Sequence, residues 1–546
     1  MRLPSFTTRV AALAALSIAP LVATLSRADE VVAVVSIDAY ADIKKQLGWI
    51  GGQVGNPTLA GFAESFILMA TQGKGLGGLD VNRPIGVVVT AGTDGTPKVQ
   101  GFVPVKDLTK LLSVVQGTLG PAQSVDGVKR IAMPNGRSID IRDQNGWAVI
   151  TQAEDTPAVE DPAEFVGPLA DTFTVAVQLF PSRMPAAMRN QLKQAAEQAS
   201  AMAASQGQQV NGPALAEAIE SLEKTEMLLY GLTIDDKNDR AFLETRYAAV
   251  DGESSTAGRD KPQLTVGSPA TADGGAAMVA GHLIGGAGDI ALAVEAIERA
   301  LPAAASRDPI TQAIAGLLRD LVGAMQAAGG VDMAITIDGS AATPQAPLPA
   351  LTLGMRVDDG AAVEKAVKAR LGGLELPDAV KVKFDAGSVG KATLHTISID
   401  VSGSPNADRF GGRLDYTLAV APKYVFLLAG GDVKARIAEV LAASGKPAGT
   451  KPPIGDLIVS IGPVLSYAAE MAAAYNPDDP GSAWLAPAAE AAAGQKAAVE
   501  FLARPLDRGS AWRISVDSET IKTLAAIAAA AQEAARGGQR VPELVP

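Results

Sequence analysis

Residues 83–119 constrain the fold of this chain most, because their pattern recurs about half a chain later. Two apolar runs, residues 84–89 and 98–105, flank turn-forming residues, an order typical of a β-hairpin. Asp107 follows, with a carboxylate that suits a helix N-cap. Apolar residues then recur at intervals of three or four, as an amphipathic helix requires: Leu108, Leu111, Leu112 and Val115. This stretch therefore predicts a hairpin followed by a helix.

The second copy of this pattern begins with two apolar runs, residues 331–338 and 350–357, joined by a longer turn. Asp359 then takes the place of the N-cap, before an apolar stripe of Val363, Val367 and Leu371. The surrounding elements recur in the same order at offsets of about 250 to 280 residues. One difference is expected: residues 433–441 predict a helix, whereas residues 156–168, which contain Pro and Glu, predict none.

This recurrence predicts an α+β fold of two tandem, similar modules, with a boundary in the polar residues 251–275. The strands outnumber those needed for βαβ crossovers, and short turns join most of them. We therefore expect mainly antiparallel, curved sheets with helices packed on one face. The expected modules are residues 29–257 and 262–532, and residues 533–546 are expected to form a loose tail.

Residues 1–28 have the pattern of a signal peptide: Arg2 and Arg9 accompany an apolar run, and small residues precede Asp29. An uncleaved anchor is the alternative. Cleavage would leave 44 basic and 59 acidic residues, a formal net charge of −15. Such a chain repels nucleic acid and anionic membranes. The sequence has no Cys, which excludes disulfides and thiolate metal sites. We expect an exported protein, periplasmic or extracellular in a bacterium, with no transmembrane span after cleavage.

The residue spacings in this sequence match no known catalytic motif in full. The two histidines, His282 and His395, lie in strand-like runs and suit ordinary structural positions. Ser221 and Lys224 have the S-x-x-K spacing, but the companion motifs of that enzyme class are absent. The glycines of residues 73–78 follow a helix, whereas a phosphate-binding loop follows a strand. The chain therefore reads as non-enzymatic, with no cofactor.

The acidic cluster of Asp235, Asp236 and Asp239 is the candidate for a metal site, and calcium is the ion that suits its carboxylate oxygens. The cluster lacks the alternating order of known calcium loops. A role in the turn between two strands explains the same residues.

The order of hairpins and helices resembles that of uncharacterised exported α+β proteins of bacterial envelopes. This resemblance covers most of the chain after residue 28, rests on no motif and transfers no functional residue. The expected function is an interaction or ligand-binding scaffold, whose partner is an envelope protein or an apolar small molecule. A carrier of an apolar ligand such as a lipid is one alternative. A hydrolase that uses carboxylates or Ser221 is another.

Overall fold

The computed structural model describes residues 30–92, 96–133, 136–153, 155–205, 224–250, 266, 277–285, 321, 323–324, 331–339, 349–402, 412–445, 453–475 and 482–538. Helices account for 34% of the described residues and strands for 41%, and the strands pair antiparallel. The expected α+β class, with mainly antiparallel sheet, is therefore confirmed at this level. The signal-peptide segment, Ser221 and most of residues 251–275 lie outside the described residues.

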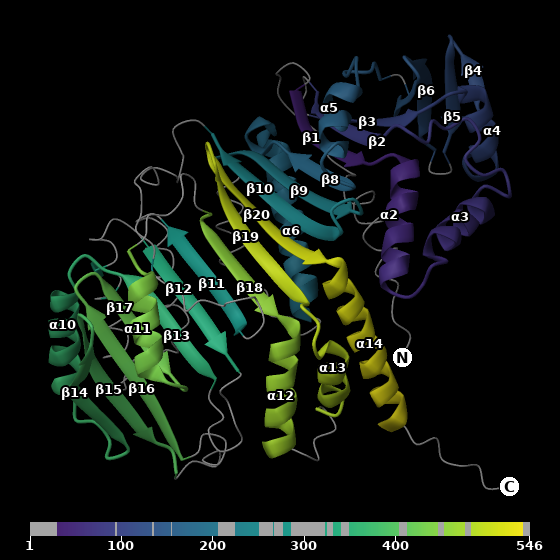
Figure 1. Cartoon of the computed structure of the whole chain (residues 1–546). Coiled ribbons are helices and arrows are strands. Elements are labelled where there is room, and N and C mark those ends of the chain that lie inside the picture. The colour runs from purple at the N-terminus through teal and green to yellow at the C-terminus, as the bar shows by residue number, and fades with distance from the viewer. Residues whose placement is uncertain are drawn as a thin grey trace, which may run out of the picture. The chain divides into compact units, whose positions relative to one another are not determined.

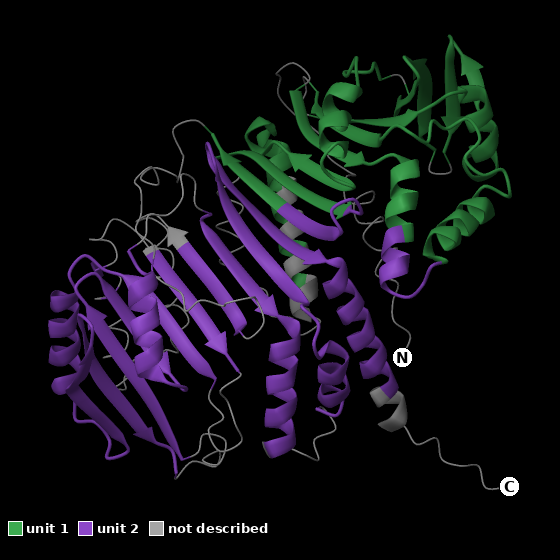
Figure 2. Cartoon of the chain, in the orientation of Figure 1, with its two compact units in different colours: residues 1–48, 58–234, 245–253 green, residues 49–57, 235–244, 254–546 purple. Residues whose placement is uncertain are grey.

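The chain divides into two compact units (Figure 2). The first unit consists of residues 1–48, 58–234 and 245–253. The second consists of residues 49–57, 235–244 and 254–546. Each unit is considered by itself below.

The first unit contains an antiparallel sheet in the strand order β4-β5-β6-β7-β3-β2-β1-β8-β9 (Figure 1). A following strand, β10 (Arg240–Ala249), has residues in both units. The strands are β1 (Glu30–Ile37), β2 (Ile85–Ala91), β3 (Pro97–Pro104), β4 (Gln123–Val125), β5 (Val128–Ala132), β6 (Ser138–Gln144), β7 (Trp147–Gln152), β8 (Val175–Leu179) and β9 (Thr225–Asp235). The helices are α2 (Tyr40–Gln53), α3 (Leu59–Ala70), α4 (Leu108–Leu119), α5 (Ala163–Ala170) and α6 (Ala186–Ser205), with a short 3-10 helix, η1 (Pro181–Arg183).

The hairpin and helix expected for residues 83–119 are β2, β3 and α4. The side chain of Asp107 accepts a hydrogen bond from Lys110 N at 2.9 Å, so the N-cap prediction is confirmed. Leu108, Leu111 and Leu112 pack against a buried cluster that includes Ile131 and Ile141. The apolar stripe thus fastens α4 to one face of the sheet.

The expectation that residues 156–168 contain no helix was wrong, because α5 begins at Ala163. Pro168 lies near the end of this short helix. Val166 is fully buried, and its backbone oxygen accepts a hydrogen bond from Ser36 Oγ at 2.9 Å. A Cβ atom at Gly86 would lie 2.3 Å from Val166 Cγ2, so the close approach of α5 requires glycine there. Tertiary packing therefore outweighs the local effect of the proline.

The second unit contains an antiparallel sheet in the strand order β14-β15-β16-β17-β13-β12-β11-β18-β19-β20. Its strands are β11 (Ala277–Gly285), β12 (Val331–Asp338), β13 (Ala350–Arg356), β14 (Val380–Val389), β15 (Ala392–Asp400), β16 (Arg413–Ala421), β17 (Tyr424–Ala429), β18 (Gly455–Ser460), β19 (Ala498–Leu506) and β20 (Gly509–Asp517). Its described helices are α10 (Gly360–Gly372), α11 (Val433–Ala443), α12 (Ile461–Tyr475), α13 (Leu485–Ala492) and α14 (Ser518–Gly538). The last three lie side by side at one end of β18–β20 (Figure 1).

Helices cover both faces of this second sheet, which corrects the expectation of helices on one face. Leu418 and Val420 of β16 belong to the core cluster of α10, together with Val363 and Val367. The alternate residues Ala419 and Ala421 of β16 belong to the core cluster of α11. Residues 418–421 are all buried, and a strand that is apolar on both faces needs a covering layer on each.

Two further predictions concern the helices. Asp359 accepts hydrogen bonds from the backbone N–H groups of Ala361 and Ala362, at 2.9 and 3.3 Å, so its N-cap role is confirmed. α14 continues to Gly538 and thus includes the start of the expected loose tail, of which residues 539–546 lie outside the described residues.

No helix in the described part of the chain combines the length and apolar character needed to cross a membrane.

Candidate functional site

Strand alternation sorts the side chains of β11 between the two faces of the second sheet. Gly281 and Leu283 belong to one face, and His282 between them belongs to the other. Gly281 lies opposite Ile335 on β12 and opposite Leu457 on β18. The face that carries Gly281 is therefore apolar across at least three strands.

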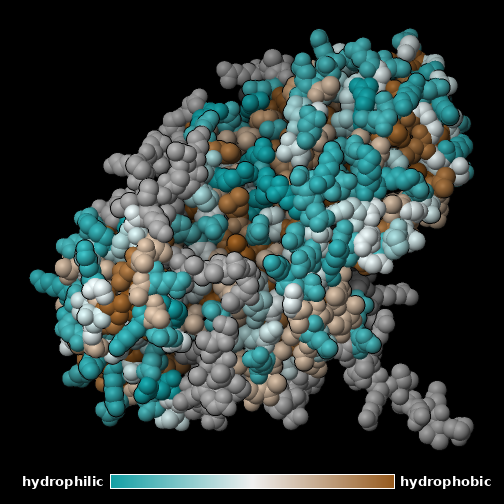
Figure 3. Space-filling model, in the orientation of Figure 1, coloured by the Kyte–Doolittle hydropathy of each residue, from teal (hydrophilic) through white to brown (hydrophobic). Residues whose placement is uncertain are grey.

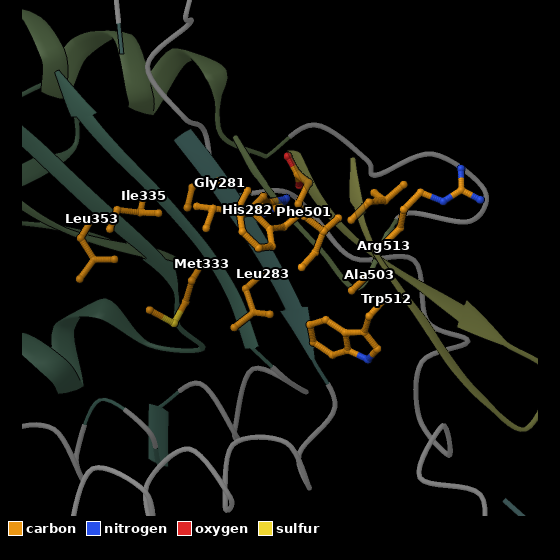
Figure 4. Close-up of a pocket in the computed structure, with 16 residues that line it drawn as sticks. Gly281, His282, Leu283, Met333, Ile335, Leu353, Phe501, Ala503, Trp512 and Arg513 are labelled. Atoms are coloured by element: carbon orange, nitrogen blue, oxygen red, sulfur yellow. The ribbon is translucent and has the colours of Figure 1, made fainter. Parts of the chain in front are cut away.

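A cavity of about 500 Å³ lies on this apolar face. Five strands, β11, β12, β18, β19 and β20, and Leu353 of β13 form its wall. The side chains of Leu283, Met333 and Trp512 point to the same side, whereas the guanidinium group of Arg513 points away from them (Figure 4). The volume is within the range of roughly 300 to 1,000 Å³ that small-molecule sites occupy.

Large apolar side chains of this wall are exposed to solvent. The exposed fractions are 55% for Trp512, 45% for Leu283, 41% for Ile514 and 38% for Phe501. Hydrophobic residues interrupt the hydrophilic surface over the strands of the second unit (Figure 3). Covering such surface contributes about 25 cal/mol for each Å² of apolar area removed from water. The wall thus offers binding energy to an apolar occupant.

The opposite face of the same strands carries charged groups. His282 Nε2 lies 2.7 Å from Oδ1 of Asp332, whose side chain is fully buried. Val266 N donates to the same oxygen at 3.2 Å, and Arg356 Nε lies 3.8 Å from Oδ2. Burial raises the pKa of Asp456 above its ordinary value, although the nearby His282 opposes this shift. The hydrogen bonds from His282 and from Val266 N, together with the nearby guanidinium group of Arg356, stabilise the buried carboxylate of Asp332.

Arg513, which follows Trp512 on β20, is also engaged away from the cavity. Its Nε donates to Oε2 of Glu244 at 2.6 Å, and its Nη2 lies 2.5 Å from the same oxygen. Arg504 Nη2 donates to that oxygen at 3.0 Å. Glu244 is fully buried, and all three residues belong to the second unit. The guanidinium group of Arg513 is thereby held by protein and not offered to a ligand.

A second cluster, of Glu364, Asp385 and His395, has the residue types of a metal site. One ligand atom from each residue lies within 4.8 Å of the other two. However, Lys368 Nζ lies 2.8 Å from Glu364 Oε1 and 2.8 Å from Asp385 Oδ1. The ammonium group lowers the pKa of Asp385, and the two carboxylates raise the pKa of Lys368. An internal cation therefore occupies the place of a metal ion.

The hydrogen bonding of His395 also disfavours a metal. Its Nδ1 accepts a hydrogen bond from Asp385 N at 3.1 Å, so in the neutral ring the proton is on Nε2. Nε2 lies 3.6 Å from Glu364 Oε1 and has no lone pair to offer an ion. Burial lowers the pKa of His395 and favours this neutral form. The cluster is best explained as an ion network that joins α10 to the edge of the sheet.

The acidic residues predicted as a calcium candidate lie at the turn between β9 and β10. Asp235 accepts hydrogen bonds from Asn238 N and Nδ2, at 3.1 and 2.7 Å. Asp239 accepts from Trp49 Nε1 at 3.1 Å and from the hydroxyl group of Ser518. Asp236 is exposed. The contacts of Asp235 are those of a turn, whereas Asp239 is bound by residues far away in the sequence, and calcium binding there stays a prediction.

Phe501 and Trp512 were missed as site residues by sequence reasoning. The signal available was alternation, since Trp512 stands between Ala511, which is buried, and Arg513, which is on the charged face. Periodicity alone does not tell which strands are neighbours. The pairing of β11 with β18, across about 175 residues of sequence, completes the wall.

Comparison of the chain with protein-family models, with curated proteins and with solved structures finds no match.

Proposed function

We propose that this chain is an exported, non-enzymatic protein of a bacterial envelope that binds an apolar small molecule on the sheet of its second unit. The observation that carries the proposal is the cavity of about 500 Å³, in which the side chains of Leu283, Phe501 and Trp512 are partly exposed. Solvent-exposed aromatic and aliphatic side chains around a concave site are the common signature of small-molecule binding. The location outside the cytoplasm rests on the signal-peptide pattern of residues 1–28.

Duplication of one module is part of this proposal. It is supported by the strand orders of the two sheets: the order from β4 to β9 in the first matches the order from β14 to β19 in the second, with β1 matched to β11. The helices α4 and α10 follow β3 and β13 at equivalent places, each behind an aspartate N-cap. The expected modules, residues 29–257 and 262–532, would be the two copies.

The proposed match of the two copies sets a valine of the first against a glycine of the second at the centre of one sheet face. In the first unit, Val35 lies opposite Val87 and Val177. In the second, Gly281 occupies the corresponding place, opposite Ile335 and Leu457. A Cβ atom at Gly281 would lie 2.7 Å from Leu457 Cδ1 and 2.8 Å from Asp456 O, so Leu457 packs closely over the glycine. The cavity lies in the second unit, so ligand binding would be a property of the second copy, and the first would serve as scaffold.

Two measurements test apolar ligand binding. Native mass spectrometry and organic extraction of the purified chain should detect a co-purifying apolar molecule. In addition, an apolar ligand should change the fluorescence of Trp512, which is 55% exposed in the free chain. Trp512→Phe should remove this change, and Trp484→Phe, at a residue exposed by 38% just before α13, should not.

A charged substitution provides the decisive control. Leu283→Glu places a carboxylate in the cavity wall and should abolish binding, since an apolar ligand would remove water from the charge without replacing its hydrogen bonds. Ile458→Glu alters a side chain of similar exposure, 41%, on β18, where alternation places it on the opposite face from Leu457. It should leave binding unchanged. Equal binding by all variants, or no bound molecule and no fluorescence change, would refute the proposal in favour of a purely structural or partner-binding role.

A further inference from the structure

We infer that the ligand of the second unit is uncharged over the part that enters the cavity, and that it is a neutral hydrocarbon chain or ring system. This inference rests on the proposed function and specifies its ligand class. It follows from how the charged and hydrogen-bonding groups near the cavity are already used.

The charged residues of the strands that form the wall are directed to the opposite face or paired there. His282 is paired with Asp332 at 2.7 Å, and Arg513 with Glu244 at 2.6 Å. Asp456 stands on β18 between two residues of the cavity wall, so alternation places its side chain on the far face, where it lies opposite His282. His282, Asp456 and Arg513 thus border the cavity, but their charged groups lie on the far face and offer no charge on the cavity side to hold an ionised headgroup.

The wall also lacks groups for a neutral hydrogen bond. The indole N–H group of Trp512 is a hydrogen-bond donor, but its Nε1 already donates to Ser510 Oγ at 3.1 Å. The remaining side chains are aliphatic, aromatic or thioether, as in Leu283, Met333 and Phe501. Among the residues that the structure describes, a buried polar group of a ligand would find no side-chain partner and would pay its desolvation cost uncompensated.

The same inventory argues against a polypeptide as the occupant. An extended peptide would bring backbone N–H and C=O groups that require partners, and this face offers none among the described residues. A helix provides its own backbone hydrogen bonds but is roughly 10 Å wide, and even two turns exceed a cavity of about 500 Å³. A small hydrocarbon satisfies both limits.

A titration with three ligands of equal chain length tests the inference on the unmodified chain. A straight-chain alcohol, carboxylate and alkylammonium differ only in headgroup, and Trp512 fluorescence reports binding of each. The titrations use about 0.15 M salt, which screens the acidic net charge of the chain beyond roughly 8 Å. We expect the alcohol to bind at least as tightly as either ion, and each added methylene to strengthen binding about fourfold until the cavity is filled.

The outcomes separate the inference about the ligand's charge from the proposed binding of an apolar molecule. A preference of about tenfold or more for the carboxylate, lost in Arg513→Gln or His282→Gln, would overturn the inference while leaving apolar binding in place. A similar preference for the alkylammonium, lost in Asp456→Asn, would do the same. Failure of all three ligands to bind at any chain length would overturn the proposed function and the inference together.

Discussion

Glu244 provides the sharpest test of the energetics of the second unit. Its carboxylate is fully buried and accepts hydrogen bonds from Arg513 at 2.6 Å and from Arg504 at 3.0 Å. Glu244→Gln keeps the size of the side chain but removes the negative charge. Two guanidinium groups would then lie close together around a neutral amide, and the amide N–H group cannot accept their hydrogen bonds.

The size of the destabilisation caused by Glu244→Gln depends on how well water solvates the two arginine side chains. Removal of one partner from a buried ion pair costs about 3 to 5 kcal/mol. The Arg513 side chain is only 17% exposed, so its charge stays poorly solvated. The Arg504 side chain is 44% exposed, and solvent compensates for much of its loss. We therefore expect Glu244→Gln to lower the free energy of unfolding of the second unit by about 3 kcal/mol, at the lower end of that range.

Urea unfolding of the full chain, followed by circular dichroism and by fluorescence, measures this change. Glu500→Gln is the matched control, because Glu500 is an exposed carboxylate on β19 of the same sheet. It should change stability by no more than about 0.5 kcal/mol. Removing Arg513 as well should cost less than the sum of the two single substitutions, because the unpaired cation disappears.

Two results would refute this reasoning about Glu244. The first is a Glu244→Gln variant as stable as the Glu500→Gln control. The second is strict additivity of Glu244→Gln and Arg513→Gln, which would mean that the two charges do not interact in the folded chain.

Three further predictions concern the second unit. Asp359→Ala should destabilise it by about 0.5 to 2 kcal/mol through loss of the N-cap of α10, and thermal unfolding would show this. Phe426→Ala should cost about 3 to 5 kcal/mol, because the ring is fully buried beside Ile437, and an unchanged denaturation midpoint would contradict it. Burial holds the pKa of His395 below 6.5, so the unfolded chain binds this proton more readily. Stability should fall as the pH drops from about 7.5 to about 5.5, and His395→Gln should reduce that loss in unfolding curves at the two pH values.

Local structure was largely readable from the sequence. The hairpin and helix of residues 83–119, and those after Val331, were found by apolar periodicity, and both aspartate N-caps make the hydrogen bonds expected of them. These features depend on neighbours within about four residues, so a single stretch of chain carries the signal. α5 was missed because its stability comes from the contact of Val166 with β1 and β2 and not from its own residues.

The candidate site was much less predictable. Its residues come from strands separated by up to about 230 residues, and their composition, Leu, Met, Phe and Trp, is that of any protein core. The sequence also gave no reason to separate the two faces of β16, since four consecutive apolar residues fit a helix as well as a doubly covered strand. Only pairing reveals which apolar residues are covered and which are not.

The sequence by itself determined the α+β class, the antiparallel hairpins and the positions of the helix caps, because these result from short-range periodicity and hydrogen bonding. The tertiary structure decided that helices cover both faces of the second sheet and that Glu244 meets Arg513 across 269 residues. It also decided that Leu283, Phe501 and Trp512 form one wall of a cavity. The physical reason is that a strand has two faces and two edges, and which of them remain exposed depends on partners that distant parts of the chain provide.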